Sequence, residues 1–420
     1  MVDVVLGLQW GDEGKGKIVD VLTPRYDVVA RFQGGPNAGH SLEFGGNKYV
    51  LNTIPSGIFH EHCINVIGNG VVIDPVSLKK EIDKASATGV NIKKSLYISE
   101  KAHVILPTHR LVDAASEAHK GDHKVGSTLR GISPTYQDKI GRSGMRIGDL
   151  LSSDFTQKYQ STVAIHKKLL DSFNYEYNLA DHEPAFFEAV EFIKQFKIIN
   201  SEYFINDLIF KGKKVLAEGA QGTLLDIDFG SYPFVTSSNT ITGGACSGLG
   251  IAPQKIEKVY GIFKAYCTRV GNGPFPTEQE NETGEKLRAL GHEFGATTGR
   301  PRRTGWLDLP TLRYAIMLNG VTDLICTKSD VLCGFEEVLV CDEYKINSTL
   351  TKEIPFNMLD GILEPQYKTF KGWAGNLSVM RKYLELPETF RQYMDFVERE
   401  IGVPVNVISV GPDREETILR

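Results

Sequence analysis

The chain has 420 residues, of which 41% are hydrophobic, and it carries a formal net charge of −5. That length permits one large α/β unit or two domains, and the acidic balance argues against a protein that coats nucleic acid. No stretch approaches the roughly 18 apolar residues of a membrane span, no signal-peptide pattern opens the chain, and the six cysteines lack C-x-x-C or zinc spacing, so we expect a cytoplasmic protein with reduced thiols.

The first predicted elements are a strand, a glycine-rich turn and a helix. Val2–Leu8 is largely apolar, Gly11–Lys17 fits the pattern G-x-x-x-x-G-K, and a helix is expected over Ile18–Thr23. The backbone N–H groups of such a turn, with the helix N-terminus, bind phosphate. Ile18 stands where a P-loop usually has the Ser or Thr that binds magnesium, so Asp12 is the nearest candidate metal ligand. A carboxylate among phosphates suggests chemistry at the nucleotide, and the strand and helix context disfavours a turn that binds nothing.

The second predicted strand leads into a loop that contains a histidine. Tyr26–Phe32 reads as this strand, and Gly34–Ser41 follows it. In α/β proteins such loops gather at the carboxyl edge of the sheet, where ligands bind. His40 could therefore form an acid/base pair with Asp12. A surface histidine that caps a turn is the alternative.

Apolar runs and stretches of helical spacing alternate along the rest of the chain. A helix is expected over Val76–Ala87, with Pro75 in its first turn behind an Asp74 cap, and helical spacing fills most of Asp154–Asn200. The remaining predicted strands are Asn65–Gly68, Leu96–Ser99, His103–Leu106, Lys214–Glu218, Val259–Phe263 and Leu324–Thr327. This alternation predicts a large α/β fold, P-loop NTPase-like, with a mostly parallel central sheet flanked by helices. Because no Pro/Ser-rich linker divides the chain, we interpret residues 1–420 as a single large α/β domain with long functional loops.

Several later loops are rich in groups that bind anions or polar substrates. Hydroxyl and guanidinium groups stand among glycines in Gly126–Gly131 and Lys139–Arg146, and Glu218–Thr223 and Thr236–Thr240 supply amide and hydroxyl donors. Thr297–Thr304 holds three arginines within four positions, which suits bidentate binding of carboxylate or phosphate. A charge run is often only a solvated face, but the neighbouring glycine and threonines favour a loop that closes over a ligand.

A Lys-x-Asp motif follows the last predicted strand. In Lys328-Ser329-Asp330 the carboxylate could accept from N1–H and the exocyclic amine of guanine, while the lysine stem lies along the ring. By itself this tripeptide is weak, and a charged strand-to-helix turn explains it as well. After a P-loop in the same chain, it favours GTP over ATP.

From Val4 nearly to Arg420 the chain resembles the adenylosuccinate synthetase family. Four motifs in the family's order carry the resemblance: Gln9–Lys17, Gly34–His40, Glu218–Asn239 and Gly295–Arg300. The resemblance implies a ligase that converts GTP, IMP and L-aspartate into adenylosuccinate, GDP and phosphate through 6-phosphoryl-IMP. This is the first committed step from IMP to AMP in purine nucleotide biosynthesis, and it involves neither nucleic acid nor a membrane.

The resemblance also implies the roles of individual residues. Asp12 would take the proton from N1 of IMP, so that the 6-oxygen attacks the γ-phosphorus of GTP. His40 would stabilise charge at the 6-oxygen and act as an acid, and Gln221 would be the third catalytic residue. The amine of aspartate would then displace phosphate. One Mg²⁺ per subunit would be bound by Asp12 and the carbonyl oxygen of Gly39. An amide oxygen leaves poorly, so a base beside the γ-phosphate explains a carboxylate in a phosphate loop.

By the same resemblance each ligand has a set of contacts. GTP would contact Gly11, Asp12, Glu13, Gly14, Lys15, Gly16, Lys17, Gly39, His40, Ser41, Arg302, Lys328, Ser329, Asp330, Ser409, Val410 and Gly411. IMP would contact Asp12, Glu13, Gly14, Lys15, Asn37, Ala38, Gly39, His40, Thr128, Arg142, Gln221, Thr236 and Arg300. Aspartate would contact Ala296, Thr297, Thr298, Gly299, Arg300, Pro301 and Arg302. The family supplies the residue at Arg142 across a dimer interface, which implies a homodimer with shared sites.

The chain departs from the family's pattern at few positions. Ser41 replaces a frequent threonine and keeps the hydroxyl, whereas Leu129 and Ser133 stand where glycine is common. If either position needs a positive φ, the contact of Thr128 with IMP would be affected. Two rival functions are a GTP-binding switch, which has no reason to bind IMP, and a P-loop kinase, which would not need aspartate.

Overall fold

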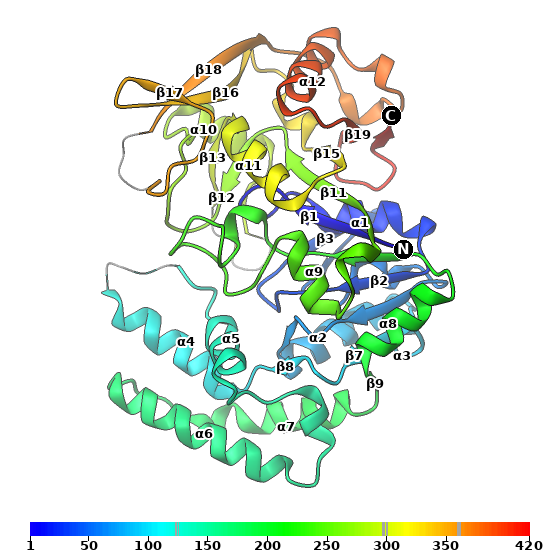
Figure 1. Ribbon diagram of the computed structural model, residues 1–420, viewed down its shortest axis with the longest axis vertical. Helices are drawn as coiled ribbons and strands as arrows, with labels where there is room; N and C mark the ends of the chain where they lie inside the picture. The colour runs from blue at the N-terminus through cyan, green and yellow to red at the C-terminus, as the bar shows by residue number, and fades with distance from the viewer. Residues whose placement is uncertain (122–123, 125, 296–298, 300, 359–362) are drawn as a thin grey trace.

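The computed structural model describes residues 1–121, 124, 126–295, 299, 301–358 and 363–420. At its centre is a ten-stranded sheet in the order β20-β19-β15-β11-β1-β10-β2-β5-β7-β9, which crosses the middle of the molecule (Figure 1). All neighbouring strands are parallel except β20, which pairs antiparallel with β19. The predicted mostly parallel sheet is therefore confirmed. Its strands are β1 (Val2–Gly7), β2 (Val28–Arg31), β5 (Ile64–Ile67), β7 (Leu96–Ser99), β9 (Lys197–Ile199), β10 (Val215–Glu218), β11 (Ile256–Lys264), β15 (Asp323–Thr327), β19 (Val405–Ser409) and β20 (Thr417–Leu419).

The remaining strands form small sheets and hairpins around the central one. They are β3 (His40–Phe44), β4 (Asn47–Leu51), β6 (Val72–Ile73), β8 (His103–Val104), β12 (Cys267–Arg269), β13 (Arg303–Gly305), β14 (Leu307–Asp308), β16 (Glu337–Ile346), β17 (Thr349–Thr351) and β18 (Glu364–Lys371). The α-helices are α1 (Lys15–Leu22), α2 (Pro75–Ser86), α3 (Ile92–Ser95), α4 (Pro107–His119), α5 (Ile132–Gly141), α6 (Phe155–Ser172), α7 (Glu183–Ile193), α8 (Ser201–Phe210), α9 (Thr242–Leu249), α10 (Glu282–Leu290), α11 (Leu309–Asn319) and α12 (Glu388–Ile401).

Both faces of the sheet are buried, and β1 shows why. Successive side chains of a strand point to opposite faces, so Val5 packs in one core with Ile18 of α1, while Val4 and Leu6 pack in the core that includes α9 and α11. Ile18 is fully buried there. The position after Lys17 therefore serves the hydrophobic core, which explains why it carries no hydroxyl for a metal.

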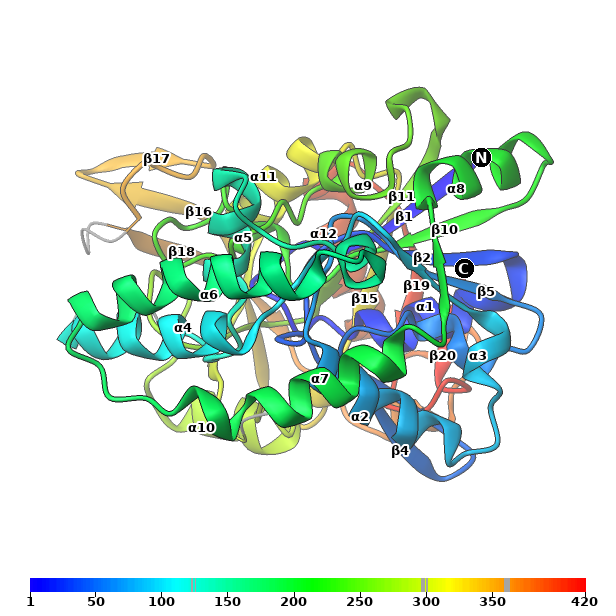
Figure 2. The ribbon, with the colours of Figure 1, turned by 90° about the horizontal axis from the view of Figure 1, so that it is seen from below.

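Helices α4 to α7 form a helical lobe at one end of the molecule (Figure 1). Seen from below, α4 and α6 lie side by side (Figure 2), and α4 contacts both α5 and α6. Within the described ranges, no helix is both long and apolar enough to cross a membrane. All six cysteines are free thiols, as predicted.

Several element boundaries differ from the predictions by a few residues, and three of these differences have an identifiable local cause. Helix α1 begins at Lys15 instead of Ile18, because Gly14 adopts a left-handed conformation and serves as its N-cap. Strand β8 ends at Val104, since Pro107 already begins α4. The stretch of helical spacing before Asn200 ends in the edge strand β9, whose three residues are too few to show a period. The predicted Asp74 cap is confirmed, with its carboxylate accepting from two N–H groups of α2.

Candidate active site

Loops that follow β1, β15 and β19 of the central sheet meet at its carboxyl edge. Lys17 Nζ donates to Ser409 Oγ at 2.8 Å and to the Gly411 carbonyl at 2.6 Å. Thr327 Oγ1 donates to the carbonyl of Glu13 at 2.8 Å, which places the end of β15 against the glycine loop. Parallel strands with helical connections bring their C-terminal loops to one edge. The sheet therefore assembles the predicted phosphate loop, the Lys-x-Asp motif and Ser409–Gly411 in one place.

The glycine loop curls around its own glutamate. Gly11, Asp12 and Gly14 have φ of 87°, 60° and 87°. The Glu13 carboxylate is buried and accepts from the N–H of Gly11 at 2.9 Å and from Lys15 Nζ at 2.5 Å. Glu13 therefore shapes the loop from inside. The first N–H groups of α1 have no partner within the helix, so they are available to an anion.

His40 lies directly against the start of α1. A Cβ added at Gly16 would lie 2.8 Å from that of His40, so only glycine allows this approach. Nδ1–H of His40 donates to Glu218 Oε1 at 2.5 Å. Ser56 donates its hydroxyl to the same oxygen at 2.6 Å and its backbone N–H to Oε2 at 2.8 Å. Glu218 therefore sets the orientation of the His40 ring.

The charges around this pair set the protonation state of His40. Burial, with the nearby Arg31, lowers the pKa of His40 even though Glu218 opposes this. Burial raises the pKa of Glu218, but the hydrogen bond from His40 and the charge of Arg31 hold that pKa below its usual value. The ring is therefore neutral, with its proton on Nδ1, and Nε2 can accept a proton when an anion arrives.

Buried polar atoms without a partner mark the ligand side of this edge. Within the described residues, Asn37 Oδ1, His40 Nε2, both amide atoms of Gln221 and Asp330 Oδ1 are buried without a hydrogen bond. Gln221 also has a φ of 55°, a costly conformation for a non-glycine residue. Native structures pair nearly all buried polar groups, so such atoms need a partner from outside the chain. All four residues are among those predicted to contact IMP or GTP.

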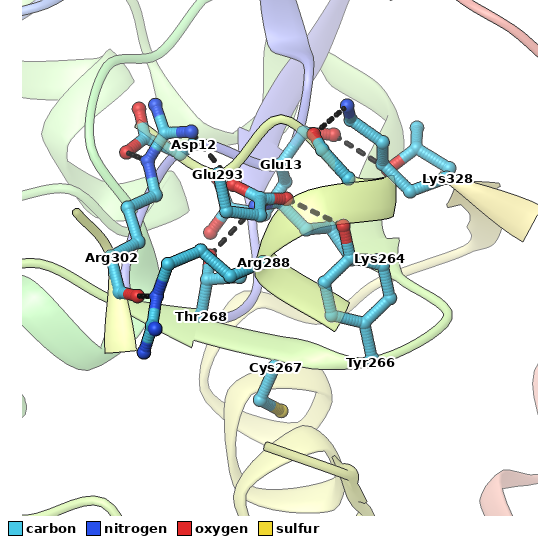
Figure 3. Close-up of polar contacts among 12 residues, drawn as sticks. Asp12, Glu13, Lys264, Tyr266, Cys267, Thr268, Arg288, Glu293, Arg302 and Lys328 are labelled. Atoms are coloured by element: carbon cyan, nitrogen blue, oxygen red, sulfur yellow. Dashed lines mark hydrogen bonds and ion pairs between the residues drawn. The ribbon is translucent and has the colours of Figure 1, made fainter. Parts of the chain in front are cut away.

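Asp12 lies in an ion pair that the sequence did not predict. Arg302 Nε donates to Asp12 Oδ2 at 2.7 Å, and Arg302 NH1 donates to Glu293 Oε2 at 2.7 Å (Figure 3). The Asp12 side chain is still 34% exposed, so a ligand can reach it. A carboxylate oxygen and the carbonyl oxygen of Gly39 are hard donors of the kind that Mg²⁺ prefers, and this donor set fits the predicted metal.

The Lys-x-Asp motif lies in a constrained turn after β15. Lys328 has a φ of 60°, and its ammonium donates to the carbonyl of Gly291 at 2.9 Å. Burial raises the pKa of Asp330. Ser329 is fully buried, so the turn is packed into the sheet edge and differs from a solvated charged turn.

The predicted IMP loops meet across the edge of the helical lobe. Ser237 Oγ donates to Ser133 Oγ at 2.8 Å and so links the segment of Thr236 to the start of α5. Leu129 has a φ of 55°, whereas Ser133 lies within α5. Of the two positions where the family often has glycine, Leu129 alone is in the left-handed region. Thr128 and Arg142 are exposed.

The predicted aspartate-binding loop is described only in part. Ala296, Thr297, Thr298 and Arg300 lie outside the described residues. Gly299 and Pro301 are exposed, and the loop closes where the Arg302 N–H donates to the Glu293 carbonyl at 2.9 Å. Among the described residues of this loop, the Gly299 N–H donates to the Gly295 carbonyl at 2.8 Å, and the Arg302 side chain reaches Asp12.

The sequence interpretation missed several residues that support the site. Glu218 and Lys264 each end an apolar strand, and a charged residue in such a strand is a usable signal of a buried polar contact. Ser56 and Glu293 lie outside the strands and helix interiors, where no periodic pattern distinguishes them.

A second group of possible metal ligands lies in the helical lobe. His109, Asp138 and His166 have ligand atoms within 4.8 Å of one another. The Leu106 N–H donates to His109 Nδ1 at 2.9 Å, so the ring proton is on Nε2, which donates to Asp138 Oδ2 at 3.0 Å. A metal on Nε2 would need a ring with no proton left. His166 Nε2 lies 3.0 Å from the same oxygen. We infer a hydrogen-bonded link between α4, α5 and α6 at this point.

This link should make the stability of the protein fall in mild acid. Burial lowers the pKa of His109 below its ordinary 6.5. Above pH 6.5 the neutral His109 ring contributes its full stabilising effect. Below pH 6.5 the unfolded chain binds a proton at this histidine whereas the folded protein does not, so the free energy of unfolding falls. Burial alone would raise the pKa of Asp138, but the hydrogen bonds of His109 and His166 have a larger, opposite effect, and the net pKa lies below its usual value. Protonation of Asp138 therefore also lowers the stability, at a lower pH than that of His109. Buried Glu81, whose pKa is raised to about 7, opposes the trend.

The measurement is therefore a comparison between the wild-type protein and His109→Gln, which keeps an amide donor but cannot titrate. Between about pH 7.5 and pH 5 the wild-type melting temperature should fall more than that of the variant. Equal pH slopes in the two proteins would contradict the prediction.

Fold and site together define an α/β enzyme of P-loop-like architecture with a nucleotide-binding edge. The family model described as adenylosuccinate synthetase matches residues 4–418. Adenylosuccinate synthetases of Parabacteroides distasonis and Bacteroides fragilis are 60% and 59% identical over 419 residues, covering 100% of this chain and 99% of each relative. The fully ligated adenylosuccinate synthetase of Plasmodium falciparum superposes with a TM-score of 0.94 at 40% identity, covering 100% of this chain and 99% of the other.

The chain belongs to the adenylosuccinate synthetase family. It is a ligase, and its function is that of this family, the GTP-dependent joining of L-aspartate to IMP. The family resemblance stated from the sequence is thus confirmed across the whole chain.

Proposed function

We propose that this chain activates the 6-oxygen of IMP with the γ-phosphoryl group of GTP at the carboxyl edge of the sheet. One observation carries the proposal: buried unpaired polar atoms of Asn37, His40, Gln221 and Asp330 lie in the segments that follow β2, β10 and β15 at this edge. Three of these residues match the family's IMP contacts, and Asp330 matches a GTP contact. The same edge therefore suits two ligands side by side.

Asp12 acts as the base. It removes the N1 proton of IMP, and the electron pair moves to the 6-oxygen, which attacks the γ-phosphorus and releases GDP. His40, directed by Glu218, takes up a proton at Nε2 when the anionic ligands arrive and donates it in a hydrogen bond to the oxygen that becomes phosphorylated. Gln221 places its amide on the same side of IMP. The amine of aspartate then forms the new C–N bond at carbon 6, the C6–O bond breaks, and phosphate leaves with the proton that the amine nitrogen gives up. Positioning and charge stabilisation supply most of the rate enhancement in such transfers.

The remaining assignments follow the family's pattern. Gly11–Lys17, Gly39–Ser41, Arg302, Lys328–Asp330 and Ser409–Gly411 bind GTP, and Ala296–Arg302 binds aspartate. Thr128, Thr236, Ala38 and Arg300 contact IMP. Asp12 and the Gly39 carbonyl hold one Mg²⁺, which when bound neutralises charge on the transferring phosphoryl group.

We also propose a cytoplasmic homodimer of single-domain subunits in which Arg142 reaches the neighbouring site. The exposed position of Arg142 at the end of α5 supports this assignment. Sedimentation at the assay concentration tests it, and a monomer with full activity would contradict it.

Isotope exchange in GTP tests the phosphorylated intermediate. With Mg²⁺ and IMP but no aspartate, ¹⁸O in the β–γ bridge of GTP should scramble into the non-bridging β positions, because reversible transfer to the 6-oxygen frees the GDP phosphate to rotate. Adding aspartate should produce the near-ultraviolet absorbance of a succinyl-purine. Scrambling without IMP, or phosphate release without a new purine, would indicate a GTPase or kinase and contradict the proposal.

A further inference from the structure

The carboxylate of Glu293 lies fully buried between two groups of site residues. Its Oε1 accepts from the Tyr266 hydroxyl at 2.5 Å and from Lys264 Nζ at 2.9 Å, and its Oε2 accepts from Arg302 NH1 at 2.7 Å. Figure 3 shows Glu293 with Lys264 and Tyr266 on one side and with Arg302 and Asp12 on the other. The mechanism above assigns Glu293 no role.

Arg302 is held from several directions, and Glu293 supplies two of the contacts. The backbone N–H of Arg302 donates to the backbone carbonyl of Glu293 at 2.9 Å, and the backbone carbonyl of Arg302 accepts from Arg288 Nε at 2.8 Å. The guanidinium donates to both side-chain carboxylates, from NH1 to Glu293 and from Nε to Asp12. When Asp12 serves the metal and the N1 proton, Glu293 is the carboxylate that still holds the guanidinium.

Lys264 balances the charge of this buried cluster. Its side chain is 1% exposed at the end of β11, where Nζ also donates to Thr268 Oγ1 at 2.7 Å. Burial would raise the pKa of Glu293, but Lys264 and Arg302 bring it down to about 2. With Asp12, the cluster contains two carboxylates and two cations. A buried ionic cluster costs desolvation energy and is weak evidence for stability, which favours a role in positioning.

We propose that Glu293, neutralised by Lys264, is a positioning residue that holds the Arg302 guanidinium beside Asp12, ready for the anionic groups of aspartate and GTP. The proposal rests on the role of Arg302 assigned under the proposed function. Without the Glu293 charge, the guanidinium loses one of its two carboxylate partners and moves from the position in which it would meet aspartate and GTP.

Steady-state kinetics of Glu293→Gln tests the proposal. We expect the KM values for aspartate and GTP to rise about 10- to 100-fold, the effect of a misplacement near 1 Å, while the KM for IMP stays within about twofold. A structural defect would change all three constants together or lower only the melting temperature.

The double variant Glu293→Gln with Lys264→Met separates positioning from simple charge balance. It removes the ammonium that the single substitution leaves buried without its partner, so the melting temperature should recover relative to Glu293→Gln. The KM values for aspartate and GTP should stay high, because Arg302 still lacks its carboxylate. Recovery of both constants together with stability would overturn the proposal.

A neighbouring pair provides the matched control. Arg303 donates from Nε to Glu278 Oε1 at 2.7 Å, one residue from Arg302 on the same chain segment. Glu278→Gln should leave all three KM values within about twofold, because Glu278 has no contact with Arg302 or Asp12 among the described residues. Equal effects of Glu278→Gln and Glu293→Gln would also overturn the proposal.

Arg302→Lys tests the assigned role of Arg302 separately from the proposed function. Unchanged KM values for aspartate and GTP in this variant would remove the assigned role of Arg302 and the proposal with it. Absence of adenylosuccinate formation by the wild-type protein would instead contradict the proposed function.

Discussion

Replacing Asp12 with asparagine should lower kcat for adenylosuccinate formation by about 10⁴-fold, the upper range for loss of a general base. The amide keeps the shape of the side chain but cannot accept the N1 proton of IMP at neutral pH. The amide is also a weaker magnesium ligand. It loses the ion pair of the wild-type protein, in which Arg302 Nε lies 2.7 Å from Asp12 Oδ2. The measurement is the initial rate of succinyl-purine absorbance with saturating GTP, IMP, aspartate and Mg²⁺.

Two controls make this result specific. Asp207→Asn changes an exposed aspartate on α8 that pairs with Lys211, and it should retain the wild-type rate because it lies outside the site. The melting temperature of Asp12→Asn should stay close to that of the wild-type protein, because a partly exposed ion pair contributes little to stability. A kcat reduced by less than about tenfold would show that another group removes the N1 proton.

Replacing His40 with asparagine should lower kcat by about 10³-fold, within the range for a positioned acid. The asparagine amide lies near the position of Nδ1, so it can still donate to Glu218, but the group at Nε2 is gone. Stability should change little, whereas charge on the 6-oxygen of IMP loses its partner in the transition state. Single-turnover measurement of GDP formation from enzyme-bound GTP and IMP reports this step directly.

Variants of Glu218 and Ser56, which lie behind His40, show whether Glu218 acts through His40. Glu218→Gln can donate to His40 Nδ1, which would move the ring proton to Nε2 and disturb the tautomer. This substitution combined with His40→Asn should be no slower than His40→Asn alone, since residues that act as a unit are not additive. Ser56→Ala removes a hydroxyl contact with Glu218 but leaves the bond to His40, so its effect should be much smaller. An additive double variant would contradict a shared role.

Much of the fold could be predicted because it is local. The strand at the N-terminus, the glycine loop and the helix after it are recognised from short runs of sequence, and so is the Asp74 cap of α2. The errors occurred where neighbouring residues outweighed the local pattern. Gly14 moved the start of α1, and Pro107 shortened β8.

Contacts between ligand-binding loops could not be predicted from local patterns. Glu218 pairs with His40, 178 residues away, and Arg302 pairs with Asp12, 290 residues away. Neither contact produces a periodic pattern in the sequence. They depend on strand order, because β10 lies between β1 and β2 in the sheet and brings Glu218 next to the histidine loop.

The sequence by itself determined the family and the sheet-and-helix alternation, and it predicted a set of ligand-binding residues, because phosphate loops and strand ends are short motifs. Only the tertiary structure decided which of these residues meet and which charges they share. Burial is the physical reason: it leaves Asn37, His40, Gln221 and Asp330 with unpaired polar atoms, and it forces Glu293 to be neutralised by Lys264 and Arg302. No single stretch of sequence shows how far a residue will be removed from water.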